Sequence, residues 1–151
     1  RWFTDEEPQT VFASGQIFGQ GKPHLATVDD LAIDEASVIV DFSGGHKLQL
    51  YLNWGMPTGF KPVAHNMLIG PLGVRQIVGS DVLVHNENGV ETTSPPDGWT
   101  EPGLNVRVER FVQAIETSTP ADMTYENGLI ALKVSQAALK SIETRQVVQL
   151  S

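Results

Sequence analysis

Aromatic and basic residues gather in a short stretch near the middle of the chain. Trp54 stands at the end of a strand-like segment, and Phe60, Lys61 and His65 follow shortly after it. Aromatic faces stack on the C–H surfaces of sugars, and a lysine ammonium donates hydrogen bonds to hydroxyl or carboxylate oxygens. These residue types predict a substrate-binding loop for a small sugar-like molecule. A purely structural reading also remains open, in which Trp54 and Phe60 fill the core and Lys61 points into solvent.

A glycine-rich stretch nearer the start, GQGK at residues 19–22, is an incomplete phosphate-binding motif. A P-loop requires Gly, four residues and then Gly-Lys-Ser/Thr, whereas Pro23 follows the lysine here. The dinucleotide fingerprint fails as well, because His24 stands where its third glycine belongs. We therefore predict no cofactor-binding residue in this chain.

Other catalytic and metal-binding patterns are also missing from the sequence. The four histidines show no metal-ligand spacing, and the acidic pairs at 29–30 and 34–35 are expected to face water at strand edges. The absence of cysteine excludes disulfides, thiolate metal sites and thiol catalysis. No Ser, His and Asp set can be argued from the chain. We predict neither a catalytic residue nor a metal ligand.

The composition is that of a globular protein. Its 151 residues suit one domain, 1–151, and the net charge of −8 without a basic cluster argues against nucleic-acid binding. No apolar run approaches the ~20 residues that a membrane-spanning helix needs. The lack of cysteine favours the cytoplasm. Because the chain opens on Arg1-Trp2-Phe3 without an initiator Met, we take it to be part of a longer protein.

The hydrophobic pattern predicts strands in the first two thirds of the chain and helices in the last third. Alternation in residues 46–54 places Leu48, Leu50 and Leu52 on one face of a half-buried strand. The expected strands are 10–18, 28–33, 36–42, 46–54, 63–69, 74–78, 81–85, 90–93 and 145–150; the expected helices are 104–117 and 124–144. This order indicates an α+β fold: an open, mainly antiparallel sheet of about six to eight strands with two long C-terminal helices on one face.

The second of these helices has a narrow polar stripe formed by Lys133, Gln136, Lys140 and the residues at 143–144. Apolar residues fill most of the remaining surface, so the helix must be covered on several sides. We expect the sheet to cover one side, with the first helix beside it and a further domain nearby.

The order of these segments carries a family resemblance. The stretch 111–150 contains a helix ending F-x-x-A-I, a turn with Pro120, a helix of the form G-x-x-A-L-x-V-x-x-A-x-x-x-S and a last strand ending Val-x-Leu. Upstream, SVIVDFSGGHKLQLYLNWGMP is a hairpin with a Trp at its end, and MLIGPLGVRQI contains Ile69, Gly70 and Gly73 in an I-G-x-x-G arrangement, similar to the family's I-x-G-x-x-G step. Together they resemble the C-terminal region of the Gfo/Idh/MocA oxidoreductases, the glucose-fructose oxidoreductase and inositol dehydrogenase family. The chain departs from the family pattern at 143–146, where members have a Ser/Thr-Gly turn, and in the long segment 79–99.

The resemblance implies a C-terminal domain of an NAD(P)-dependent oxidoreductase acting on a sugar, polyol or related hydroxy compound. Such a domain supplies part of the substrate pocket and pairs through its open sheet face into a homodimer or higher oligomer. The family's Rossmann domain, its Glu-Lys-Pro lysine and its Asp-x-x-x-His helix have no counterpart in this sequence, so the chain alone should be inactive, and NAD or NADP belongs to the full-length enzyme. The alternative is a stand-alone, non-catalytic carbohydrate-binding or assembly module.

Overall fold

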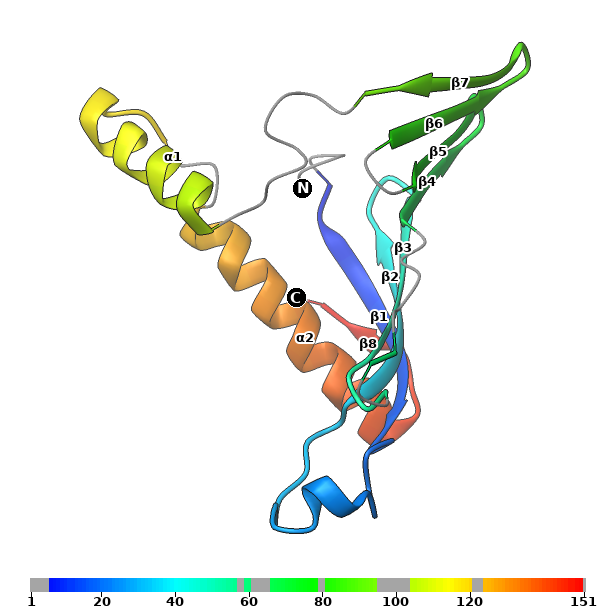
Figure 1. The fold of residues 1–151 in the computed structure, drawn as a ribbon, viewed down its shortest axis with the longest axis vertical. Helices are drawn as coiled ribbons and strands as arrows, with labels where there is room; N and C mark the ends of the chain where they lie inside the picture. Colours follow the sequence, from blue (N-terminus) through cyan, green and yellow to red (C-terminus); the bar gives the residue numbers. More distant parts are fainter. Residues whose placement is uncertain are drawn as a thin grey trace. The chain divides into compact units, whose positions relative to one another are not determined.

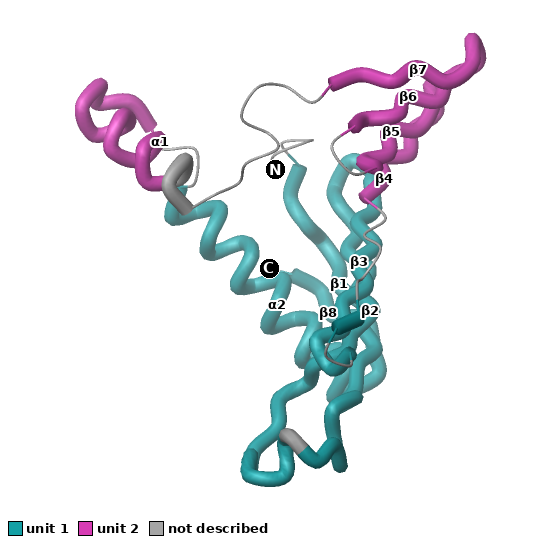
Figure 2. Tube along the Cα trace, in the orientation of Figure 1, with its two compact units in different colours: residues 1–60, 123–151 teal, residues 61–122 magenta. Residues whose placement is uncertain are grey.

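The computed structural model describes residues 6–56, 59–60, 66–78, 81–94, 104–120 and 124–150, with the backbone alone for residues 24 and 104–107. The chain divides into two compact units, Arg1–Phe60 with Met123–Ser151, and Lys61–Asp122 (Figure 2). The described strands are all paired antiparallel and the described helices include one of twenty residues, so the fold is α+β, as predicted.

The first unit contains a four-stranded sheet in the order β3-β2-β1-β8 (Figure 1). Its strands are β1 (Pro8–Gln16), β2 (Glu35–Phe42), β3 (Lys47–Asn53) and the short β8 (Val148–Gln149). A tight turn at 43–46 joins β2 to β3, and Gly45 takes a positive φ of 87° there. Such a turn requires a conformation that glycine adopts without steric cost, which explains the Ser-Gly-Gly sequence.

Helix α2 (Tyr125–Thr144) packs on one face of this sheet. Valines and alanines at alternate positions of β1 and β2 point toward the helix, and Gly15 allows it to come close. A Cβ on Gly15 would lie 2.9 Å from Cδ1 of Ile142 and 2.7 Å from the carbonyl oxygen of Glu35. The buried members of this core are Val11, Ala13, Ala36, Val38, Val40 and Ala137.

The second unit contains another four-stranded sheet, in the order β4-β5-β6-β7. Its strands are β4 (Asn66–Gly70), β5 (Gly73–Val78), β6 (Asp81–Asn86) and β7 (Gly89–Thr93). Helix α1 (Leu104–Thr117) belongs to the same unit. Its apolar side chains Val108, Phe111, Val112 and Ile115 are exposed to solvent.

Three sequence expectations differ from the structure. The eight described strands form two sheets of four rather than one sheet. Residues 28–33 form no strand, and the loop before β2 instead contains the short 3-10 helix η1 (Pro23–Leu25). The last strand is limited to Val148–Gln149, because the chain is still completing the turn after α2 at 145–146.

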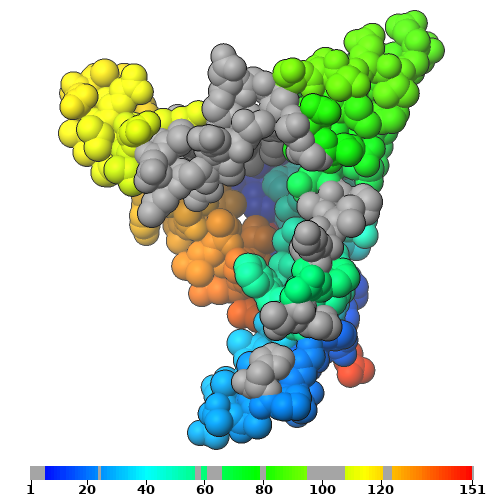
Figure 3. Space-filling view, viewed as in Figure 1, coloured from blue at the N-terminus to red at the C-terminus, as the bar shows by residue number. Residues whose placement is uncertain are grey.

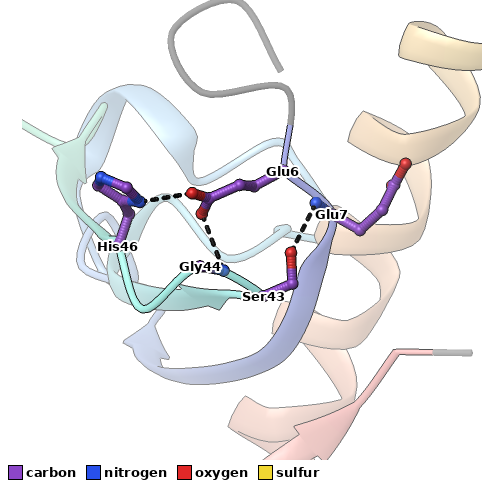
Figure 4. Close-up of polar contacts among 5 residues, drawn as sticks. All are labelled: Glu6, Glu7, Ser43, Gly44 and His46. Atoms are coloured by element: carbon purple, nitrogen blue, oxygen red, sulfur yellow. Dashed lines mark hydrogen bonds and ion pairs between the residues drawn. The ribbon is translucent and has the colours of Figure 1, made fainter.

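A cluster of polar contacts ties the residues before β1 to the β2–β3 turn (Figure 4). The Glu6 carboxylate accepts a hydrogen bond from the Gly44 amide at 3.1 Å, and its other oxygen lies 2.8 Å from Nδ1 of His46. The Ser43 amide donates to the Glu7 carbonyl at 3.0 Å. These contacts hold the residues before β1 against the β2–β3 turn.

Among the described helices, none is both long enough and apolar enough to cross a membrane.

Candidate functional site

Two loops meet at one end of the first sheet. The register pairs Gln16 with Glu35 and Glu35 with Asn53, so the end of β1, the start of β2 and the end of β3 lie at the same end of the sheet. The segment 17–34 follows β1, and the segment from Trp54 to Phe60 follows β3. In Figure 3 the blue atoms of the first segment occupy this end of the unit. We call the place where they meet the loop junction.

Asp34 is the central residue of the loop junction. Its carboxylate accepts hydrogen bonds from the amides of Phe18 at 2.6 Å and Gly19 at 2.9 Å. Its backbone carbonyl accepts from the amide of Trp54 at 2.7 Å. The amide of Asp34 itself donates to the Gln16 carbonyl at 3.3 Å. One residue thus connects the loop after β1 to the loop after β3.

Lys22 makes the second connection between the two loops. Its ammonium donates a hydrogen bond to the carbonyl oxygen of Gly55 and lies 4.6 Å from the centre of the Phe18 ring. A cation over an aromatic face is attracted by the ring's electron density. The half-buried lysine is therefore held by a carbonyl on one side and by a ring on the other.

Glycine is needed at two positions of the loop junction because segments of the chain approach each other closely there. A Cβ on Gly55 would lie 2.8 Å from both the Asp34 carboxylate and the Phe18 ring. A Cβ on Gly19 would lie 2.7 Å from the same carboxylate. The carboxylate thus fits between two glycines, and any side chain at either position would displace it.

The predicted substrate-binding residues divide into described and undescribed ones. Trp54 and Phe60 are 83% and 54% exposed, so the interpretation of these rings as core residues is wrong. Lys61 and His65 lie outside the described residues. The part of the predicted loop that the structure covers therefore presents two aromatic rings to solvent next to the loop junction.

Among the described residues, no group of three or more His, Cys, Asp and Glu is placed to hold a metal ion. Asp29 and Asp30 are exposed, whereas Asp34 is engaged with backbone amides rather than facing water. His46 is paired with Glu6. His85 is half-buried on β6, and its Nε2 atom has no hydrogen-bond partner within the described part of the chain.

The loop at residues 19–22, which carries the incomplete phosphate-binding motif, can be compared with the geometry that a nicotinamide dinucleotide requires. A dinucleotide pyrophosphate is bound at the N-terminus of a helix that follows a glycine-rich turn. The helix after Lys22 is only three residues long, and the lysine points to Gly55 instead. The described residues of this loop do not fit the cofactor.

Sequence reasoning found the loop after β3 but missed the residues that anchor it. The residue pattern places Phe18 at the end of the first expected strand, Lys22 in an ordinary loop and Asp34 at a solvated strand edge, whereas β1 ends at Gln16. The available signal was an aspartate directly before a strand, since short carboxylates there accept backbone hydrogen bonds. Its partners in the loop after β1 could not be inferred, because they depend on the pairing of three strands.

Comparison with solved structures gives a consistent result over nearly the whole chain. Aldose-aldose oxidoreductase from Caulobacter crescentus, in complex with glycerol, matches with a TM-score of 0.76 and 19% identity over 99% of this chain and 43% of its own. Myo-inositol 2-dehydrogenase from Lactobacillus plantarum matches with a TM-score of 0.65 and 21% identity over 100% of this chain and 44% of its own. An NAD binding oxidoreductase from Klebsiella pneumoniae matches with a TM-score of 0.76 and 19% identity, over 96% and 46%.

These matches concern part of each oxidoreductase. The chain spans between 42% and 50% of the length of the most similar structures. No protein-family profile and no curated protein sequence matches it. At these identities the likeness establishes the fold. The chain therefore has the fold of the corresponding part of sugar and inositol oxidoreductases, which confirms at the level of fold the resemblance to the Gfo/Idh/MocA proteins.

Proposed function

We propose that this chain is the C-terminal substrate and oligomerisation domain of an NAD(P)-dependent oxidoreductase acting on a sugar, polyol or related hydroxy compound. The observation that carries the proposal is a structural match over 95–100% of this chain to oxidoreductases of which it spans about half. Two of them are named for aldose and myo-inositol substrates. The cofactor and the reacting groups would belong to the remainder of the protein.

The loop after β3 is the part of this domain that we assign to the substrate. Trp54 and Phe60 offer exposed rings on which the C–H face of a sugar can stack. Lys61 and His65 follow in the sequence and would supply polar contacts to hydroxyl groups. An exposed aromatic pair in the segment directly after a paired strand suits a pocket wall, because β3 fixes the start of the loop.

The sheet face opposite α2 is the surface that we assign to self-association. Phe12 and Ile39 are neighbours across β1 and β2 and are 43% and 39% exposed. Tyr51 on β3 shares this face and is 60% exposed. Serine and glutamine side chains lie between these apolar groups, a mixture that is typical of interfaces between protein subunits.

The test is an activity screen of the full-length protein. NAD and NADP would each be combined with a panel of aldoses and polyols, with reduced nicotinamide followed by absorbance. We expect turnover of at least one compound, and about a tenfold lower kcat/KM for Lys61→Ala, the effect of losing one polar contact. Lys47→Ala, at the other end of β3, is the matched control and should keep the wild-type value.

Two results would contradict the proposal. Turnover of no panel compound, together with sugar binding by the 151-residue chain alone, would favour the stand-alone carbohydrate-binding module. Micromolar binding of NAD or NADP by the 151-residue chain in calorimetric titration would mean that the cofactor site lies within it.

A further inference from the structure

We infer that Asp34 and Lys22 are positioning residues that fix the backbone of the loop after β3 and thereby set the place of the Trp54 ring. The inference rests on the proposed function only where it concerns substrate. Neither residue belongs to the stretch that the sequence marks as substrate-binding, and both act through the residues that they hold.

The first step is the backbone anchoring of Trp54 and Gly55. The Trp54 amide is held by the Asp34 carbonyl at 2.7 Å, and the Gly55 carbonyl is held by the Lys22 ammonium. The Gly55 amide donates to Oδ1 of Asn53 at 2.9 Å. Three hydrogen bonds therefore restrain two consecutive residues directly after the last paired residue of β3.

The second step is that the anchors are themselves restrained. The Asp34 carboxylate is fixed by two amides of the loop after β1, those of Phe18 and Gly19. The Lys22 ammonium is fixed over the Phe18 ring. Phe18 thus supports both anchors, one through its amide and the other through its side chain. A Cβ on Gly55 would lie 2.8 Å from this carboxylate, so the arrangement requires glycine at that position.

The third step concerns the Trp54 ring. With 83% of its surface exposed, this side chain has little packing of its own to hold it. Its position therefore depends on the backbone from which it projects. Ordering a ligand-stacking ring before binding lowers the entropy that binding must overcome, so a loose backbone would weaken affinity without removing any ligand contact.

The test uses hydrogen exchange measured by mass spectrometry on the full-length protein, with four variants. Lys22→Met keeps the aliphatic stem but removes the hydrogen bond to Gly55, and Asp34→Asn removes one acceptor oxygen. Both should accelerate exchange in the peptide covering residues 54–60 by about five- to tenfold, while peptides from β1 and β2 stay protected. Lys22→Arg retains a donor and a cation and should restore the slow exchange. Lys47→Met, which removes a lysine contact at the opposite end of β3, is the matched control and should leave this peptide unchanged.

A second measurement separates this inference from the proposed function. The dissociation constants of myo-inositol and D-glucose would be measured for the wild type and for the same variants. A several-fold rise for Lys22→Met that Lys22→Arg reverses supports positioning of the substrate loop. If the wild type binds no aldose or polyol, the proposed function fails, while the exchange data still decide the anchoring. Unchanged exchange at 54–60 in both Lys22→Met and Asp34→Asn, or equal acceleration in Lys47→Met, would overturn the inference.

Discussion

The hydroxyl of Ser141 accepts a hydrogen bond from the amide of Ala13, which lies 128 residues earlier in the chain, at 2.9 Å. The same hydroxyl donates to the carbonyl of Gln146 at 2.7 Å, and the side chain is fully buried. Strand β8 pairs with β1 only at Thr10 and Val11. The amide of Ala13 lies beyond this pairing and would lack a hydrogen-bond partner without Ser141. Ser141 therefore completes the edge of the sheet where β8 ends.

Replacing Ser141 with alanine should lower the free energy of unfolding by about 1–3 kcal/mol. The substitution leaves the buried Ala13 amide without an acceptor, and an unsatisfied buried donor carries its full desolvation cost. Urea denaturation followed by circular dichroism measures the change. Ser135→Ala on the same helix is the matched control, because that hydroxyl is exposed and contacts only the Ala131 carbonyl. Equal effects from the two variants would mean that the contact with Ala13 contributes nothing.

Two glycine substitutions should change stability in opposite directions. Gly15→Ala places a methyl group within 3 Å of the Glu35 carbonyl and the Ile142 side chain, so we expect a loss of about 1–3 kcal/mol from overpacking. Gly128→Ala lies on α2 with nothing within 4 Å of its added Cβ and should gain about 0.5–1 kcal/mol from helix propensity. Thermal unfolding of both variants tests the pair. A stabilised Gly15→Ala variant would show that α2 does not approach β1 as closely as described.

Helix α2 ends on an arginine in a conformation that favours glycine. Arg145 has φ 57° and ψ 32°, and its amide donates to the Ser141 carbonyl at 2.7 Å. A residue with a Cβ is strained in this left-handed region, so Arg145→Gly should raise the free energy of unfolding by about 0.5–1 kcal/mol. Arg145→Ala removes the charge but keeps the Cβ and should give no such gain. A gain of the same size in both variants would assign the effect to charge.

This arginine also shows how far the sequence could predict the end of the helix. The sequence lacks a glycine at 143–146, where the resembled family has a Ser/Thr-Gly turn. The helix nevertheless ends there, with Arg145 in the left-handed conformation that glycine favours. The last strand is predicted at 145–150, but its late start could not be predicted, because the turn after α2 occupies residues 145–146. Alternation correctly placed β2 and β3, since Val38 and Leu50 are paired on the face toward α2.

The residue types predict the loop after β3 as the candidate site, and its role in substrate binding stays a prediction; the residues that anchor this loop are not predicted. Trp54 and Phe60 have residue types that suit either a core or a ligand surface, and their exposure argues against the core role, while ligand contact stays a prediction. Residues 28–33 are expected from the sequence to form a strand. The chain instead crosses this region as part of the loop that carries Phe18 and Lys22 to Gly55. Contacts between loops depend on strand order, which local patterns do not encode.

An exposed carboxylate on β2 should make stability depend on acid pH. Hydrogen bonds from Lys47 and then from Thr10 lower the pKa of Asp41 below its ordinary value. A lowered folded-state pKa means that the stabilisation is present above the ordinary value and is lost as the pH falls through the folded value. The melting temperature of Asp41→Asn should therefore lie below that of the wild type at neutral pH and converge with it in strong acid.

The matched control for Asp41 is Asp30→Asn, which removes an exposed charge outside the strands. It should change the melting temperature little at any pH. A difference between wild type and Asp41→Asn that persists unchanged into strong acid would mean that the carboxylate charge is not the source of the effect.

The open face of the first sheet leads to a prediction about self-association. Phe12, Ile39 and Tyr51 lie on the face opposite α2, and burying such side chains against a second copy removes apolar area from water. We expect the chain to form dimers at micromolar concentration. Tyr51→Glu should shift it toward monomer, because the new charge would have to be desolvated in the interface. Light scattering across a dilution series measures the oligomeric state of the wild type and of Tyr51→Glu.

The control is Gln49→Glu, on the same strand and face, which tests whether any added charge has this effect. A smaller shift toward monomer is expected there because no apolar side chain is lost. If the chain stays monomeric at all concentrations up to ~100 μM, this face is exposed to solvent and the prediction of self-association through it is wrong.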